Sequence, residues 1–149
     1  ELYSHVIIAG LKKKSGLTKR DEFLLRMAII LYQIGKYVNL LDSQAHAWNL
    51  IRGTDIFGIS DKEKDIVASV VYYDHKGNPS DDDTPFRILS DTAKMTALKL
   101  ISIFRMVRAM DISRKQKLKD ITARATGMFD KNKEFFENVY GLEVKLERR

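Results

Sequence analysis

The chain has 149 residues, of which 44% are hydrophobic and 31% charged, and its formal net charge is +6 with a pI near 9.5. This predicts one globular domain over residues 1–149, and the absence of cysteine excludes disulfides, thiolate catalysis and cysteine-ligated metals. With no apolar run near the ~18 residues of a membrane span and no signal-peptide layout, we expect a cytoplasmic protein without membrane contact.

The net charge leaves two interpretations open. An excess of lysine and arginine favours a polyanionic partner such as polyphosphate, nucleotide or nucleic acid. It is equally typical of a solvated surface that happens to be rich in lysine. The chain starts at Glu1 without a methionine, which favours a domain of a longer protein.

Apolar residues recur at helical spacing along most of the chain, which predicts a mostly α-helical fold. A first helix over 2–11 runs into a basic run and stops at Ser15-Gly16. Thr18, with Asp21 three residues later, predicts the N-cap of a core helix over 19–34, which Gly35 ends in the left-handed conformation. Its expected buried stripe is Phe23, Met27, Ile30 and Ile34, widened by Leu24, Ala28 and Leu31.

The next helices are bounded by caps and loop residues. Asp42 or Ser43 is expected to cap a helix to Arg52 that turns Ala45, Trp48 and Ile51 inward, and Gly53 ends it. Ser60 and Glu63 form a capping box before a helix with a valine- and isoleucine-rich face. A loop follows over 75–84. The longest helix, over 92–110, should bury Met95, Leu98, Ile101, Phe104 and Val107.

The C-terminal part is less regular. A basic helix is expected over 114–120, a weak pattern follows near 122–127, and a last amphipathic helix spans 131–140 before Gly141. The segment 144–146 reads as extended. Together these patterns predict an all-α, compact multi-helix domain with a minor extended C-terminal segment.

One series of residues runs in order along nearly the whole chain: 31–39, His46, 50–60, Glu63, 73–76, Phe86, Leu89, 103–105, 109–113 and the ending 134–142. In this order and spacing the residues resemble the C-terminal domain of the exopolyphosphatase / guanosine pentaphosphate phosphatase (Ppx/GppA) family. The resemblance implies a longer, strand-forming connection between Ile121 and Phe129 than this sequence contains.

The resemblance implies an HD-like helical domain that follows two actin-like domains bearing the phosphohydrolase active site. No glycine-rich phosphate loop of the actin type and no alternating strand pattern occurs in this sequence, so we expect those catalytic domains to be absent here and this chain alone to be non-catalytic. Mg²⁺ is then a cofactor of the parent enzyme, and none is expected in this chain. The partners implied are polyphosphate or pppGpp/ppGpp-like polyanions, the actin-like domains and a second copy in a homodimer.

The positions of an HD metal site are degenerate in this sequence. Better-preserved members of the family carry His-Asp where this chain has Tyr32 and Gln33, and His where it has Ser43. His46 survives, the next histidine position is Asp74 with His75 beside it, and the final aspartate falls on Arg108. Because Tyr, Gln and Arg are poor or repulsive partners for a cation, we predict no metal here. We predict instead a hydrogen-bonded polar plug of Tyr32, Gln33, His46 and Asp74.

Arg108 admits two interpretations. It can pair with Asp74 in an internal salt bridge, or it can point into the former metal cavity and bind a phosphate. Arg105 lies one turn earlier on the same helix face. The sequence favours the salt bridge without deciding between them.

Two basic clusters predict a surface for a polyanion. The residues assigned to this surface are Lys12, Lys13, Lys14, Lys19, Arg20, Arg105, Arg108, Arg114 and Lys115. Aromatic residues do not interleave with these clusters, which argues against nucleic acid. Two further functions stay open: an independent HD-type metal-dependent phosphohydrolase and an alarmone-binding regulatory domain.

Overall fold

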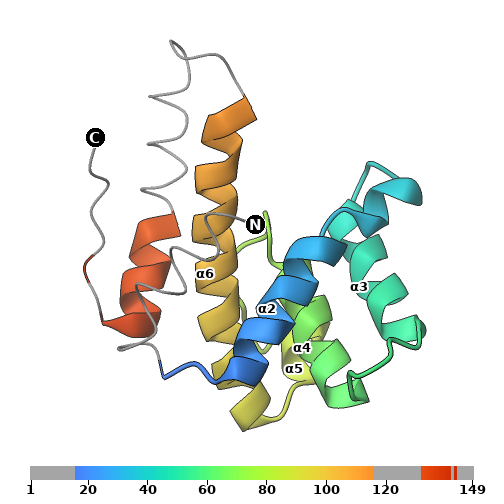
Figure 1. Cartoon of the computed structure of the whole chain (residues 1–149), viewed down its shortest axis with the longest axis horizontal. Coiled ribbons are helices and arrows are strands. Elements are labelled where there is room, and N and C mark those ends of the chain that lie inside the picture. Colours follow the sequence, from blue (N-terminus) through green and yellow to red (C-terminus); the bar gives the residue numbers. More distant parts are fainter. Residues whose placement is uncertain (1–15, 116–131, 142, 144–149) are drawn as a thin grey trace.

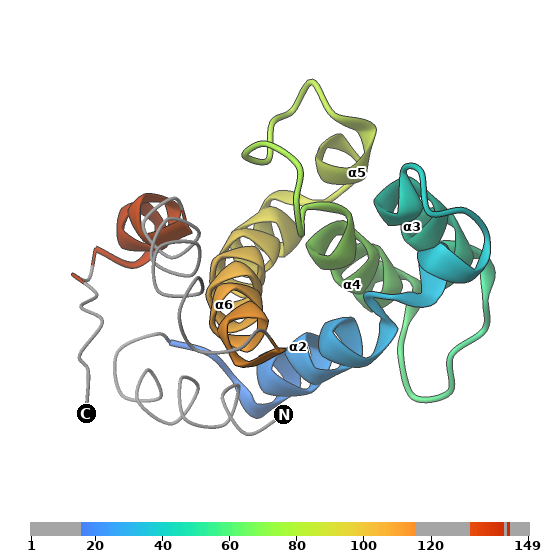
Figure 2. The same ribbon diagram turned by 90° about the horizontal axis from the view of Figure 1, so that it is seen from above.

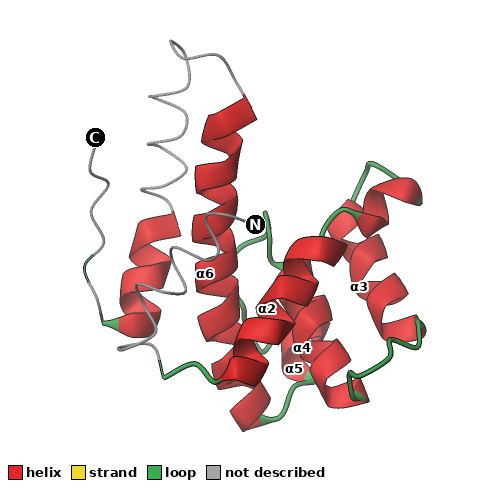
Figure 3. Cartoon of the chain, viewed as in Figure 1, coloured by secondary structure: helices red, strands yellow, loops and turns green. Residues whose placement is uncertain are grey.

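The computed structural model describes residues 16–115, 132–141 and 143, with side chains for these residues except 110–115. It contains α2 (Lys19–Leu31), the 3₁₀ helix η1 (Ile34–Tyr37), α3 (Ser43–Gly53), α4 (Asp61–Tyr72), α5 (Thr84–Arg87), α6 (Asp91–Lys115) and a helix over 132–140. These residues include no strand, which confirms the all-α prediction (Figure 3). The predicted helix over 2–11, the 121–129 connection and the extended 144–146 segment lie outside the described residues.

Helix α4 is the centre of the fold. It contacts α2, α3, α5 and α6, and the view from above shows α3 on one side of it and α6 on the other (Figure 2). The 132–140 helix lies on the outer side of α6, away from α3 (Figures 1 and 2). No helix in the described parts of the chain is long and apolar enough to cross a membrane.

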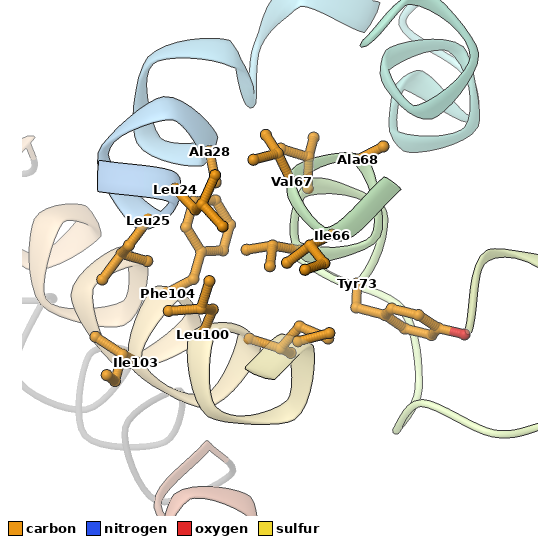
Figure 4. Close-up of a cluster of buried hydrophobic side chains, with 14 of the residues drawn as sticks. Leu24, Leu25, Ala28, Ile66, Val67, Ala68, Tyr73, Leu100, Ile103 and Phe104 are labelled. Atoms are coloured by element: carbon orange, nitrogen blue, oxygen red, sulfur yellow. The ribbon is translucent and has the colours of Figure 1, made fainter. Parts of the chain in front are cut away.

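The core forms where α2, α4 and α6 face one another. Leu24, Leu25 and Ala28 from α2 meet Ile66 and Val67 from α4 and Leu100, Ile103 and Phe104 from α6 (Figure 4). All of these side chains are buried. Each large apolar side chain removed from water contributes about 1.5–3 kcal/mol, so this three-helix junction is the main source of stability.

Both predicted capping boxes are confirmed. The Asp21 amide donates to Thr18 Oγ1 over 3.1 Å, and the Thr18 amide donates to the Asp21 carboxylate over 2.8 Å. Ser60 and Glu63 form the same reciprocal pair at the start of α4. These motifs satisfy amide donors that the first helical turn leaves without partners, which fixes where α2 and α4 begin.

The predicted buried stripe of α2 is wrong in part. The helix ends at Leu31, and Phe23 and Ile30 are exposed, whereas Leu24, Leu25 and Ala28 form the buried face. The helix carries apolar residues over more than one face, and its packing against both α4 and α6 selects the face that is buried.

Gly35 does not end α2 in a left-handed conformation. It lies inside η1, and the positive-φ glycines of the described residues are Gly16, Gly58 and Gly141. Glycine is needed for a different reason: a Cβ at this position would lie 1.8 Å from the Ser43 carbonyl oxygen and 2.6 Å from the Ala47 amide nitrogen. The missing side chain lets η1 pack directly against the first turn of α3.

Smaller differences concern helix faces and lengths. In α3 the buried residues are Ser43, Ala47 and Ile51, so Ala45 and Trp48 are only partly covered. Met95 is exposed, and α6 continues through Lys115 into the segment where a separate basic helix was expected. The short helix α5, which has Pro85 in its first turn, was not predicted.

Candidate functional site

Of the predicted site residues, Tyr32, Asp74, His75 and Arg108 lie together around a buried ion pair. Asp74 follows α4 and its side chain is 6% exposed, while Arg108 comes from α6 and is 14% exposed. Arg108 Nε donates to Asp74 Oδ1 over 3.3 Å, and Nη2 donates to Oδ2 over 3.4 Å. Of the two interpretations left open for Arg108, the structure contains the internal salt bridge.

Tyr32 contacts the arginine of this ion pair. The Arg108 guanidinium lies over the Tyr32 ring at 4.0 Å from its centroid, and the same ring meets Phe104 edge to face at 6.2 Å. An arginine held between an aromatic face and a carboxylate is fixed by both a cation–π contact and an ion pair. Tyr32 therefore helps to orient the cation that Asp74 neutralises.

His75 is the second basic neighbour of Asp74. Its Nε2 lies 3.2 Å from Asp74 Oδ2, and nearly half of its side chain is exposed. The imidazole is thus the solvent-facing member of a row that runs from Tyr32 through Arg108 and Asp74 to His75. A single carboxylate is thus shared between the Arg108 guanidinium and the His75 imidazole.

The predicted plug of Tyr32, Gln33, His46 and Asp74 does not form as a unit. Gln33 Nε2 donates to Tyr32 Oη, but Gln33 is exposed, and Asp74 is taken by Arg108 and His75. The His46 side chain makes no hydrogen bond to another described residue, and the Ser43 hydroxyl donates weakly to Gln44 Oε1 over 3.5 Å. The charged partner from α6 accounts for this, because charge-assisted hydrogen bonds are roughly twice as strong as neutral ones.

The donor set does not fit a divalent metal. No group of three or more histidine, aspartate or glutamate side chains arranged to hold a metal occurs among the residues with described side chains. The one buried carboxylate of the cluster, Asp74, already contacts the guanidinium of Arg108. A metal beside it would meet a fixed positive charge and a neutral phenol, which are repulsive and weak partners respectively.

Arg105 has a structural role. It is 5% exposed, and its guanidinium donates to the carbonyls of Tyr73, Lys76 and Gly77 over 2.6–2.8 Å and to Asn78 Oδ1 over 3.2 Å. Burial lowers the pKa of Arg105, and the nearby Asp74 partly offsets this. Because its donors hold the loop after α4 against α6, Arg105 is removed from the predicted polyanion surface.

A hollow of about 280 Å³ opens beside these arginines. It lies between the loop after α4, helix α6 and the start of the 132–140 helix, and it is lined by Asp74, His75, Lys76, Gly77, Asn78, Arg105 and Asn132. The row from Tyr32 to His75 thus ends at a polar depression whose lining includes both signs of charge.

The basic residues predicted to bind a polyanion have different positions. Arg20 is tied to Glu63 over 2.6 Å and to the Gly58 carbonyl, so it joins the starts of α2 and α4. Lys19 is exposed at the first turn of α2. The residues Lys12, Lys13 and Lys14 and the side chains of Arg114 and Lys115 lie outside the described parts.

The excess positive charge belongs to particular stretches of the sequence. The described residues contain 16 Lys and Arg against 16 Asp and Glu and are therefore neutral. The remaining residues, 1–15, 116–131, 142 and 144–149, contain 10 against 4, which is the whole net charge of +6. The described residues are therefore balanced in charge, and the basic character comes from the other residues of the sequence.

One exposed feature was not predicted from the sequence. Tyr37 at the end of η1 and Val38, Leu40 and Leu41 in the segment before α3 are exposed to solvent, together with Ile30 from α2. Periodicity gave no reason to separate these residues from the core. The available signal was the apolar composition of residues 37–41 directly after the tightly packed Gly35.

Comparison with known families identifies the domain. Residues 4–148 match Ppx/GppA phosphatase, domain III. No curated protein matches the chain, and no solved structure matches it. Because the match extends over nearly the whole sequence, the chain belongs to the Ppx/GppA phosphatase family, as a domain III of that family.

Proposed function

We propose that this chain is a non-catalytic, HD-like helical module of a Ppx/GppA phosphatase that binds a polyphosphate-type polyanion and contributes to dimerisation. Its partners would be polyphosphate or a pppGpp/ppGpp-like nucleotide, a second copy and the actin-like domains of the parent. Hydrolysis, and the Mg²⁺ that supports it, would belong to those actin-like domains.

The distribution of charge is the observation that carries the polyanion part. The described residues are neutral as a set, and the whole net charge of +6 comes from the other residues of the sequence, which include the lysines at 12–14 and at 117 and 119. A chain of phosphates neutralised by such a cluster releases its condensed counterions, which drives binding at low salt.

The pairing of Arg108 with Asp74 supports a non-catalytic role. An independent HD-type hydrolase needs a divalent metal to activate water. A metal bound to Asp74 would lie next to the guanidinium of Arg108. A test of this point is phosphate release from polyphosphate and from nucleotides with added Mg²⁺ or Mn²⁺. We expect no metal-dependent turnover; turnover that His46→Ala abolishes would show that the HD-type hydrolase is correct.

Binding is tested with labelled medium-chain polyphosphate and the 149-residue chain over a salt series. Replacing Lys12, Lys13 and Lys14 by Gln should weaken binding by about tenfold or more and reduce the salt slope by about 2–3. The matched control replaces Lys36, Lys62 and Arg87, which are exposed on the described body, and changes the net charge by the same amount. An equal loss in both variants would contradict a localised site, and no binding at low salt would contradict the proposal itself.

A further inference from the structure

An apolar surface lies between η1 and α3, and we call it the η1 surface. Its members are Tyr37, which is 92% exposed, Leu40 and Leu41, which are 78% and 79% exposed, and the more shielded Val38 and Ile30. Monomeric proteins rarely expose contiguous apolar patches beyond a few hundred Å², and such patches mark interaction sites.

The η1 surface is held in place by its own backbone. The amides of Val38 and Asn39 both donate to the Gly35 carbonyl over 3.1 Å, and the Leu41 amide donates to Asn39 Oδ1 over 2.9 Å. Gly35 itself packs against the Ser43 and Ala47 backbone. The apolar side chains are therefore presented by an ordered turn anchored to α3, so their exposure is a property of the fold.

A hollow lies directly beside Tyr37. It has a volume of about 430 Å³ and is lined by Ile30, Leu31, Tyr32, Gln33, Ile34 and Tyr37. One face thus carries both a protruding ring and a depression that is lined by isoleucine and leucine side chains together with Tyr32 and Gln33. When a projection and a depression lie on the same face, a two-fold axis can place the projection of each copy in the depression of the other.

The size of the η1 surface suits such a contact. At these exposed fractions the five side chains offer on the order of 600–700 Å², given that one large aromatic side chain buries about 150–250 Å². A stable standard-size interface takes about 800 Å² from each partner. The polar rim contains Lys36 and the Asp42–Lys76 ion pair, so both signs of charge are present.

We infer that the η1 surface binds a second copy of this chain in an isologous contact, in which Tyr37 of each copy enters the hollow of the other. This rests on the dimerisation part of the proposed function and assigns it to a surface. The contact lies on the side of the molecule away from the 132–140 helix (Figures 1 and 2). The dimer would thus form beyond α3, at the opposite side from α6.

The test is sedimentation velocity over a micromolar concentration series with the whole chain. The wild type should dimerise, and the double variant Leu40→Glu/Leu41→Glu should raise the dimer Kd on the order of 100-fold or more, because it places charges in the centre of an apolar contact. Phe57→Glu is the matched control, since Phe57 is 103% exposed on the turn before α4 and outside the η1 surface. Circular dichroism and urea midpoints confirm that the variants are folded.

The possible results separate this inference from the proposed function. If the dimer persists in Leu40→Glu/Leu41→Glu, or if Phe57→Glu weakens it equally, the η1 surface is not the dimer interface. Dimerisation itself would not be contradicted by that result. If the wild-type chain stays monomeric, both the η1 interface and the dimerisation part of the proposed function are wrong. Polyphosphate binding is measured on the same samples, and its loss in a variant that still dimerises concerns only the proposed ligand.

A direct check uses the absence of cysteine. Val38→Cys introduces a single thiol, and a short bismaleimide should link two copies if the η1 surfaces meet. Phe57→Cys, treated identically, should not be cross-linked. Equal cross-linking of the two variants would argue against a contact at η1.

Discussion

Gly35→Ala should be strongly destabilising, because the structure leaves no room for a side chain at this position. The added Cβ would lie 1.8 Å from the Ser43 carbonyl oxygen, 2.9 Å from the Ser43 carbonyl carbon and 2.6 Å from the Ala47 amide nitrogen. All three are backbone atoms of α3, so no side-chain rotation can relieve the overlap. Restoring an ordinary contact of about 3.4 Å requires η1 and α3 to separate by about 1.6 Å, against the tight packing of protein interiors.

The expected cost follows from this separation. Overpacking of a core usually costs about 1–3 kcal/mol, and the value here should reach or exceed about 3 kcal/mol because two backbones must move apart. That is a large share of the roughly 5–15 kcal/mol that stabilises a domain. Urea unfolding, followed by circular dichroism and by Trp48 fluorescence, measures the loss.

Gly53→Ala is the control for this experiment. Gly53 ends α3, its Cβ would meet nothing within 4 Å and its φ is not positive, so the free energy of unfolding should stay equal or rise by up to about 1 kcal/mol. A Gly35→Ala protein destabilised by less than about 1 kcal/mol would refute the reasoning. Because η1 carries the exposed apolar residues, Gly35→Ala should also weaken dimerisation.

Three further predictions concern the described body. Arg105→Lys should lower the free energy of unfolding by about 3 kcal/mol, because an ammonium group cannot replace the guanidinium donors to the loop carbonyls. A decrease below about 1 kcal/mol in chemical unfolding would contradict the role of Arg105 in holding the loop after α4. Hydrogen bonding from Arg20 lowers the pKa of Glu63 to about 2, so stability present above pH 4.5 should fall as pH drops towards 2. Solvent screening limits this to about 1 kcal/mol, and Glu63→Gln should flatten the pH profile of the urea midpoint. Tyr73→Phe removes the 3.0 Å hydrogen bond to Asp83 while keeping the buried ring, and should cost about 1 kcal/mol; an unchanged thermal midpoint would show that water replaces the phenol.

The ion pair of Arg108 and Asp74 joins a guanidinium from α6 to a carboxylate that follows α4. Tyr32 contacts the same guanidinium from the end of α2, so residues from three helices meet in one cluster. These contacts link α2, α4 and α6 at one end of the fold.

Helix positions and caps were determined by the sequence because they depend on near neighbours. Thr18 with Asp21 and Ser60 with Glu63 satisfy amides three residues away, so the starts of α2 and α4 could be read directly. The all-α class followed from periodicity. The family resemblance followed from the order of residues such as His46 along the whole chain.

The tertiary structure decided what each side chain contacts. Arg105 and Arg108 have the same chemistry one helical turn apart, yet one holds loop carbonyls and the other pairs with Asp74, because different segments pack over each position. The role of Gly35 depends on how closely α3 approaches, and the exposure of Tyr37 depends on where that approach leaves η1. Contacts between residues far apart in the chain depend on how the helices pack, and local sequence patterns do not predict this packing.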